Sequence, residues 1–281
     1  MRALSVVIFV LMIMSCRHKE SILFYYVSGT GSINSIREFE GKIYALNSSR
    51  SQILLLENDG ISVFKDINIG GRDFLQDFFI RDGMIFYSNT YDEIFTAAEN
   101  AIEDTVRIEN PGRIAVAGEY LFVTSRIREG KYFHLRSFCL KGQGINAEVR
   151  LNSGSGKDPA FSKVWMKISN GDLWLYNPFR NKIGQYDRSL NIRSFFELDH
   201  QYSYGAFTVG EMEVVILAEK DDEIYLCKID RVSKAVSFEK LPVPKGNYDI
   251  NASGVTDRSA YLYDYIKGKI LVVPTGDFLS F

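Results

Sequence analysis

Short runs of alternating apolar and polar residues, separated by turn residues, recur along most of the chain. In the clearest copy, residues 170–177 read Asn-Gly-Asp-Leu-Trp-Leu-Tyr-Asn and lead into residues 181–187, Asn-Lys-Ile-Gly-Gln-Tyr-Asp. A period of two residues and an abundance of Tyr, Phe, Val and Ile are typical of β-strands. Long runs with a helical period and a charged opposite face are missing from the sequence. The pattern therefore predicts an all-β protein.

The same unit recurs six times, at a spacing of about 35–55 residues that brackets the ~40–50 residues of a propeller blade. The six copies cover residues 41–64, 82–96, 118–135, 170–192, 211–230 and 258–273. Each unit offers about four strands once the preceding apolar run is counted. Four short antiparallel strands per repeat are typical of a β-propeller. We therefore predict a six-bladed β-propeller with four-stranded blades.

Two of these units resemble the six-bladed propellers of the NHL and TolB-like kind. The blade pattern of those proteins is Gly, an apolar-aromatic strand, Asn or Asp, and a strand that ends in Tyr-Asp. Residues 171–187 match it well, and residues 41–59 match it partly, with Glu57 and Asn58 where Tyr-Asp would stand. A seven-bladed ring is the alternative and needs another repeat between the third and fourth copies. Residues 142–159 there look like one strand and a Gly/Ser loop, which favours six blades.

A propeller ring must be closed to protect its strand edges. Residues 21–27 form an apolar run ahead of the first unit, and we predict that they pair with residues 270–273 of the last blade. The tail at residues 278–281 competes for that position.

The N-terminus has the pattern of a processing signal. Arg2 precedes an apolar stretch, residues 3–14, that is too short to span a hydrocarbon layer, which needs ~20 residues. Residues 13–16, Ile-Met-Ser-Cys, resemble the lipobox of bacterial lipoproteins, although Met14 is larger than the usual residue. The resemblance implies lipidation of Cys16. The alternative is an ordinary secretory peptide with an incidental cysteine.

This interpretation divides the chain into a signal peptide at 1–15, a lipidated tether at 16–21 and one propeller domain at 22–281. Arg17, rather than Asp, follows the cysteine. By resemblance to enteric lipoproteins, this favours the outer membrane over the inner membrane. The predicted location is the cell envelope, with the membrane contacted through the lipid on Cys16.

Composition narrows the choice of partner. A hydrophobic content of 46% is ample for one large core, and the net charge is only −2. Lys and Arg do not cluster as nucleic-acid binding requires, so nucleic acid is not an expected partner. Cys139 and Cys227 lie in strand patterns and are predicted to be free thiols, with a disulfide as the alternative.

Catalytic motifs are scarce, and no catalytic residue can be assigned. The two histidines of the mature body, His134 and His200, have no metal-ligand spacing around them. Residues 219–223, an acidic run, fit a solvated hairpin turn better than a calcium loop. No metal site or cofactor is predicted, and Ca²⁺ is the one ion that the resemblance to six-bladed calcium-dependent lactonases allows. Its candidate ligands are Asp158, Asn177, Asn247, Asp249 and Asn251.

The strongest local cluster is aromatic. Trp165 and Trp174 belong to the fourth unit, and exposed Trp, Tyr and Arg are typical of binding hot spots. Aromatic residues at alternating positions also form the core between blades, so both interpretations stay open. The candidate binding residues are Trp174, Tyr176, Phe179, Arg180, His200 and Tyr202.

The lack of a concentrated catalytic signature favours a non-catalytic binding module. Propeller loops surround a rigid ring, and such loops commonly carry recognition. The sequence therefore predicts an envelope-anchored propeller that recognises a protein or a glycan. The alternative is a metal-dependent hydrolase or lyase with its site at the central channel.

Overall fold

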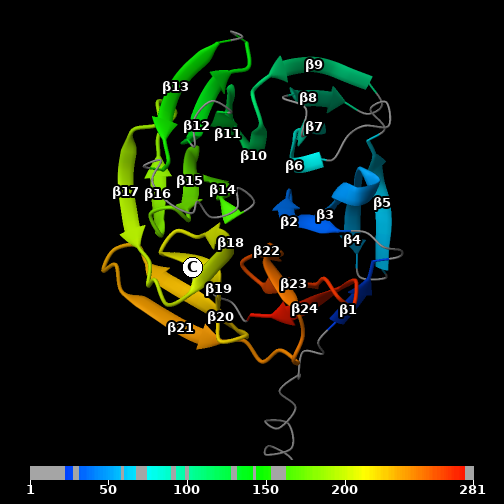
Figure 1. Ribbon diagram of the computed structural model, residues 1–281, viewed down its shortest axis with the longest axis vertical. Coiled ribbons are helices and arrows are strands. Elements are labelled where there is room, and N and C mark those ends of the chain that lie inside the picture. The colour runs from blue at the N-terminus through cyan, green and yellow to red at the C-terminus, as the bar shows by residue number, and fades with distance from the viewer. Residues whose placement is uncertain are drawn as a thin grey trace, which may run out of the picture.

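The computed structural model is a ring of six β-sheets, each with four antiparallel strands (Figure 1). It describes residues 23–27, 32–57, 60–67, 75–89, 93–98, 101–127, 132–141, 144–152 and 163–275. Within these ranges, no helix is long and apolar enough to cross a membrane. The lipidation candidate Cys16 and the tail at 278–281 lie outside the described residues. The predicted six-bladed architecture is confirmed, and the seven-bladed alternative is wrong.

The first three blades follow the order of the chain, from the ring axis outward. Blade 1 contains β2 (Ile33–Phe39), β3 (Lys42–Asn47), β4 (Gln52–Glu57) and β5 (Gly60–Asp66), with the one-turn 3-10 helix η1 (Ser48–Arg50) between β3 and β4. Blade 2 contains β6 (Leu75–Arg81), β7 (Met84–Asn89), β8 (Glu93–Ala98) and β9 (Ala101–Arg107). Blade 3 contains β10 (Pro111–Ala117), β11 (Tyr120–Ile127), β12 (Tyr132–Cys139) and β13 (Ile145–Arg150).

The last three blades complete the ring. Blade 4 contains β14 (Trp165–Ser169), β15 (Asp172–Asn177), β16 (Lys182–Tyr186) and β17 (Ile192–Glu197). Blade 5 contains β18 (Ser203–Val209), β19 (Glu213–Lys220), β20 (Glu223–Asp230) and β21 (Val236–Lys240). Blade 6 contains β22 (Tyr248–Val255), β23 (Ser259–Asp264) and β24 (Lys269–Pro274), and takes its outermost strand, β1 (Leu23–Tyr26), from the other end of the chain.

The ring closes as predicted. Strand β1 pairs antiparallel with β24, with Leu23 opposite Val272 and Tyr25 opposite Ile270. Tyr25 and Ile270 are both buried, so the closing contact is apolar as well as hydrogen-bonded. The two ends of the folded domain are thereby held in one sheet.

The glycine of the repeat has a specific structural role in three blades. In blades 1, 2 and 4 the two innermost strands are joined by a two-residue turn, Glu40-Gly41, Asp82-Gly83 or Asn170-Gly171. Both residues of each turn have positive φ, near 50° for the first and 75° for the glycine. A type I′ turn requires this conformation and matches the twist of paired strands. The predicted hairpin at 219–223 also holds, since β19 and β20 are joined at Asp221 and Asp222.

The core lies between neighbouring blades. Trp174 of β15 and Leu217 of β19 are buried in one cluster that joins blades 4, 5 and 6. Cys227 is buried in the same cluster as a free thiol, and burial raises its pKa to about 12. Cys139 is also free but only half-buried, so the predicted pair of free thiols is present.

Candidate functional site

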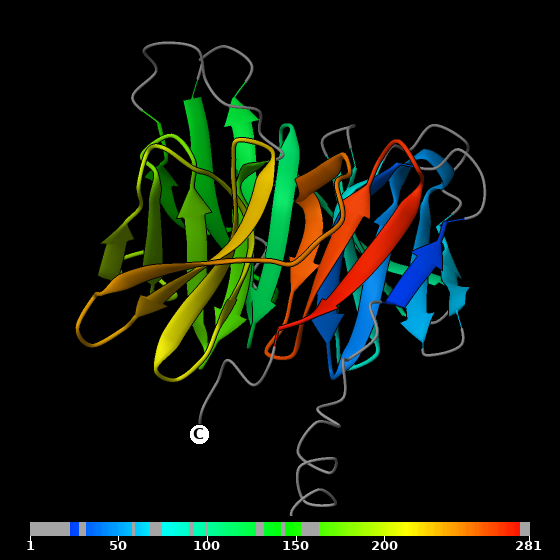
Figure 2. The ribbon, with the colours of Figure 1, turned by 90° about the horizontal axis from the view of Figure 1, so that it is seen from below.

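All six innermost strands begin at one face of the ring. Each blade is an antiparallel meander of four strands, so the chain returns to the face where the blade began before it starts the next innermost strand. We call the face where the innermost strands begin the groove face. The opposite face, where they end, we call the tether face, because Leu23, the first described residue, lies there opposite Val272 near the end of β24. Figure 2 shows the ring edge-on, with β1 at its edge.

Three charged side chains meet on the ring axis. Asp77 of β6 is fully buried and lies between Arg37 of β2 and Arg113 of β10. Asp77 Oδ2 accepts a 2.6 Å bond from Arg37 Nη2, and Asp77 Oδ1 lies 3.3 Å from Arg113 Nη1. The backbone N–H of Ile114 also donates to Oδ2, at 2.9 Å. The carboxylate therefore joins the innermost strands of three blades.

The two guanidinium groups are held by further partners. Arg37 donates to the Ile114 carbonyl at 3.1 Å, and Arg113 donates through Nε to the Val164 carbonyl at 3.2 Å. The Trp165 ring lies against both cations, 4.4 Å from the Arg113 guanidinium carbon and 5.5 Å from that of Arg37. Such cation–π contacts are stronger when water is excluded. We call Arg37, Asp77, Arg113 and Trp165 the axial cluster.

Burial changes the pKa of Arg37 in this cluster. It lowers the pKa of Arg37 to about 10, because Asp77 compensates only part of the desolvation and Arg113 adds repulsion. Arg37 nevertheless remains a cation at neutral pH. The four residues of the axial cluster thus bring two cations and one carboxylate together between the blades.

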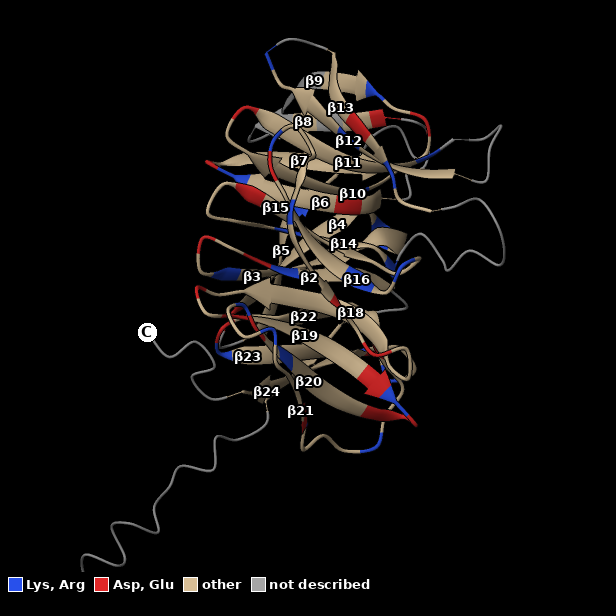
Figure 3. Ribbon diagram, turned by 90° about the vertical axis from the view of Figure 1, so that its left-hand side faces the viewer, with Lys and Arg blue, Asp and Glu red and all other residues tan. Residues whose placement is uncertain are grey.

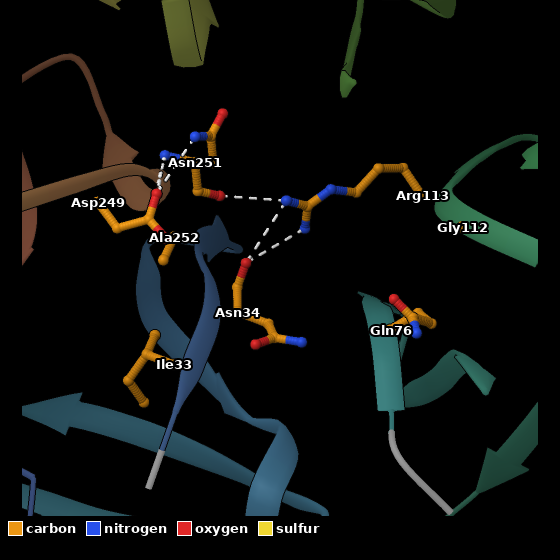
Figure 4. Close-up of a pocket in the computed structure, with 8 residues that line it drawn as sticks. All are labelled: Ile33, Asn34, Gln76, Gly112, Arg113, Asp249, Asn251 and Ala252. Carbon is orange, nitrogen blue, oxygen red and sulfur yellow. Dashed lines mark hydrogen bonds between the residues drawn. The ribbon is translucent and has the colours of Figure 1, made fainter. Parts of the chain in front are cut away.

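A pocket of about 200 Å³ lies where the axial cluster meets the groove face (Figure 4). Arg113 forms one wall and donates to the Asn251 carbonyl at 3.1 Å and the Asn34 carbonyl at 3.4 Å. Opposite, Asp249 Oδ1 accepts the backbone N–H of Asn251 at 2.9 Å and its side-chain amide at 3.2 Å. Gln76 completes the polar lining. We call this the axial pocket.

A second pocket, of about 240 Å³, shares Asn251 with the axial pocket. Its lining combines aromatic rings with hydrogen-bonding side chains, namely Lys163, Tyr176, Asn181, His200, Tyr202, Ser203, Tyr204, Glu219 and Asn251. A third pocket, of about 630 Å³, shares Glu219 with the second and extends past Tyr248 and Tyr265. We call the second the tyrosine pocket and the three together the groove.

The aromatic walls of the tyrosine pocket are fixed by ring contacts. Tyr176 and Tyr204 meet edge to face at 5.9 Å, and Tyr202 stacks on Phe238 at 4.2 Å. Burial raises the pKa of Tyr204, so its hydroxyl stays protonated at neutral pH. That O–H has no hydrogen-bond acceptor among the described residues. Asn251 Oδ1 likewise has no hydrogen-bond donor among them. The residues that line the pocket therefore include one donor and one acceptor that are buried without a partner among the described residues.

The carboxyl group of Glu219 contributes an acidic residue to the lining of the tyrosine pocket. Burial raises the pKa of this carboxyl, and the nearby carboxylates Asp222 and Asp249 raise it further, whereas Lys163 opposes them. A ligand group that donates a hydrogen bond or carries positive charge would relieve this repulsion.

The structure brings together three of the six predicted binding residues. Tyr176, His200 and Tyr202 all line the tyrosine pocket. Trp174 instead is 1% exposed and stacks on Phe196 in the core between blades. Phe179 is half-buried, with its ring 4.7 Å from Phe133 of blade 3, and Arg180 is exposed next to it.

The candidate calcium ligands are dispersed. Asp249 and Asn251 line the axial pocket, and Asn247 lies in the third pocket. Asn177 is buried and donates to the Leu151 carbonyl at 3.1 Å, while Asp158 lies outside the described residues. Across the described ranges, no three His, Cys, Asp or Glu side chains converge as a metal site. His134 lies elsewhere, with Nδ1 2.7 Å from Glu148 Oε1.

Sequence reasoning missed the axial cluster. Its signal is one buried charged residue within each of three innermost strands: Arg37 in β2, Asp77 in β6 and Arg113 in β10. Because a propeller gathers its innermost strands at the axis, opposite charges inside these strands could have indicated a cluster there.

Comparison with known proteins supports the fold and leaves the family open. No family model and no curated sequence matches the chain. A DUF4221 family member from Bacteroides vulgatus has a TM-score of 0.61 at 10% identity, covering 91% of this chain and 96% of its own. Virginiamycin B lyase from Staphylococcus aureus has a TM-score of 0.59 at 12% identity, covering 91% and 99%. An exported protein from Bacteroides fragilis has a TM-score of 0.60 at 13% identity, covering 86% and 83%. At these identities the likeness is one of fold.

Proposed function

We propose that this chain is an envelope-anchored lipoprotein whose propeller binds a ligand in the groove without converting it. The observation that carries this proposal is the groove itself, in which an unsatisfied donor, Tyr204 O–H, and an unsatisfied acceptor, Asn251 Oδ1, lie among fixed aromatic rings. Buried groups without partners cost free energy, which a complementary ligand recovers on binding. A polar group of a protein or a glycan partner supplies such complementarity.

The axial cluster supports a binding role over a catalytic one. Asp77, its one carboxylate, is engaged by two arginines and a backbone N–H. A general base needs a free lone pair directed at the substrate. The contacts of the Asp77 carboxylate instead favour a structural role. The cluster therefore acts as the floor of the binding site.

Anchoring through Cys16 would orient the groove. The chain reaches β1 at the tether face, and the axial pocket lies on the groove face. A tether of a few residues would hold the tether face toward the membrane. The groove would then point away from the bilayer, where a partner in the adjoining compartment can reach it.

The anchor has a direct test. Cys16→Ser is expected to move the chain from the membrane fraction to the soluble envelope fraction, because two or more acyl chains are needed for stable anchoring. Mass spectrometry of the mature N-terminus should show the acyl groups only in the parent chain. Cys139→Ser is the matched control and should stay with the membrane. A Cys16→Ser chain that remains membrane-bound would contradict lipid anchoring.

The groove is tested by site-specific photo-crosslinking in cells. A photoreactive amino acid at position 200, in the tyrosine pocket, is expected to trap a partner. The same group at position 212, an exposed Met between β18 and β19 on the tether face, is the control. Cross-links from position 200 that disappear in a Tyr202→Ala background would support the groove. Equal products from both positions would argue against it, and turnover of a trapped ligand would favour the hydrolase or lyase alternative.

A further inference from the structure

The described residues that line the tyrosine pocket include one lysine and one glutamate, and these two do not pair. Lys163 precedes β14 of blade 4, and Glu219 lies in β19 of blade 5. Both residues are partly buried. Neither the Lys163 ammonium nor the Glu219 carboxylate has a hydrogen bond or an ion pair among the described residues. The pocket therefore lies between two opposite charges that do not neutralise each other by contact.

A lysine and a glutamate on neighbouring strands of one sheet do meet in this ring. In blade 4, Lys182 of β16 and Glu197 of β17 stand opposite each other, with Nζ 2.7 Å from Oε1. Lys163 and Glu219 belong to different blades and line the same cavity. The spacing of the two blades keeps their charges apart, so a molecule inside the cavity can contact both.

The surroundings of Glu219 favour a positive group beside its carboxylate. Burial raises the pKa of this carboxyl, and the negative charges of Asp222 and Asp249 raise it further. Lys163 opposes that effect without touching the carboxylate. An ammonium group at hydrogen-bond distance would stabilise the charged carboxylate directly. A ligand with an ammonium group alone would meet repulsion from Lys163, whereas one that also carries a carboxylate would satisfy both residues.

The size of the tyrosine pocket limits the ligand. Its volume of about 240 Å³ corresponds to roughly eight waters, at ~30 Å³ per water. A molecule of the size of one amino acid fits this space, and a folded domain does not. The fixed rings of Tyr176 and Tyr202 give the carbon atoms of such a molecule an apolar wall. Because Glu219 also lines the third pocket, a longer side chain has room to extend there.

We propose that the tyrosine pocket binds a small zwitterion, an α-amino acid, with its ammonium group at Glu219 and its carboxylate at Lys163. The proposal rests on the proposed binding role of the groove and names the class of ligand for one of its three pockets. Opposite charges a few bonds apart on one small molecule are what the two residues recognise.

The first test is thermal unfolding of the full chain, purified in detergent, with each common amino acid in its L and D forms. For at least one of them we expect a saturable rise in Tm of roughly 5–10 °C at a hundredfold excess over its Kd. Saturation separates binding at a site from a general solvent effect, which grows steadily with concentration. The absence of a saturable response to every amino acid would overturn the proposal.

Derivatives of the tightest ligand then test each charge by isothermal titration calorimetry. The N-acetyl form lacks the ammonium group, and the amide form lacks the carboxylate. Each derivative should bind at least about tenfold more weakly, because each loses a charge-assisted hydrogen bond. A derivative that binds as tightly as the free amino acid would show that one of the two charges is not recognised, and the zwitterion would be wrong.

Variants assign the charges to residues. Glu219→Gln should abolish the preference for the free amine over the N-acetyl form and keep the preference for the acid over the amide. Lys163→Gln should do the reverse, a split that a general disturbance of the pocket would not produce. Glu119→Gln and Lys141→Gln, at an exposed ion pair, are the matched controls and should keep both preferences. Unchanged preferences in Glu219→Gln and Lys163→Gln would place the ligand elsewhere. If a variant fails to fold, the derivatives still decide on the parent chain.

The zwitterion and the binding role of the groove can fail separately. Cross-links from position 200 together with no binding of any amino acid would keep the binding role and overturn the zwitterion. Binding of an amino acid that is recovered unchanged would support both. Conversion of the bound amino acid would keep the site and contradict a non-catalytic role.

Discussion

Asp77→Asn is expected to lower the free energy of unfolding by about 3–5 kcal/mol, because the change removes a buried carboxylate that contacts two buried cations. At about 2–4 °C per kcal/mol for a domain of this size, Tm should fall by roughly 10 °C. The side chain keeps its shape, so packing is conserved and the loss reports on charge. The change removes the carboxylate that Arg37 Nη2 contacts at 2.6 Å and Arg113 Nη1 at 3.3 Å. Calorimetry or urea unfolding measures the change.

Glu197→Gln is the control for this prediction, since its ion pair with Lys182 is solvent-exposed. Exposed pairs contribute little, so its Tm should stay within experimental error of the parent chain. A double variant, Asp77→Asn with Arg37→Gln, should be more stable than the sum of the two single losses predicts, because it also removes the cation that Asp77 contacts at 2.6 Å. Additive losses would argue that Asp77 acts through packing alone.

Gly205→Ala is expected to lower the free energy of unfolding by about 3 kcal/mol, at the upper end of the cost of overpacking. Gly205 lies in β18, the innermost strand of blade 5. A Cβ atom there would lie 2.1 Å from the backbone carbonyl oxygen of Ile250 in β22. The obstacle is backbone, so two innermost strands must separate before the methyl group fits. Because Ile250 and Asn251 line the tyrosine pocket, ligand binding should weaken as well.

Gly184→Ala is the matched control for the strand contact. The three atoms nearest to its Cβ would all belong to the Tyr186 side chain, the first at 2.8 Å, and a side chain can turn aside where a backbone carbonyl cannot. We expect a clearly smaller loss of stability than for Gly205→Ala, measured by urea unfolding of both variants. Equal losses of stability in the two variants would mean that the close approach of β18 to β22 is not the reason why position 205 requires glycine.

The strands and their order could be predicted from the local pattern of apolar, polar and turn residues. Residues 172–177 alternate with a period of two after an Asn-Gly turn, and the structure joins β14 to β15 at that turn, with β16 following β15. The pairing of residues 23–26 with the last blade also followed, because a ring must protect its edge strands. On the side of the ring that Figure 3 shows, many charged residues lie near strand ends and turns.

Only part of the candidate site could be predicted from the sequence. Tyr176, His200 and Tyr202 were predicted and do line one pocket, yet Trp174 in the same strand as Tyr176 is core. The alternation of apolar and polar residues indicated which residues share a face of a blade. It did not indicate which end of that face the neighbouring blade covers, because this depends on how the two sheets pack. Glu219, which the sequence indicated only as part of a hairpin turn, was missed as a lining residue of this pocket.

The sequence by itself determined the all-β class, the number of blades, the turns and the closing strand, because each depends on patterns within about 50 residues or on the need to close an edge. Only the tertiary structure decided the axial cluster and the groove. Asp77 lies 40 residues after Arg37 and 36 residues before Arg113, and the three meet only because the ring gathers the innermost strands at its axis. Contacts across a ring depend on radius and register, and no local preference encodes either.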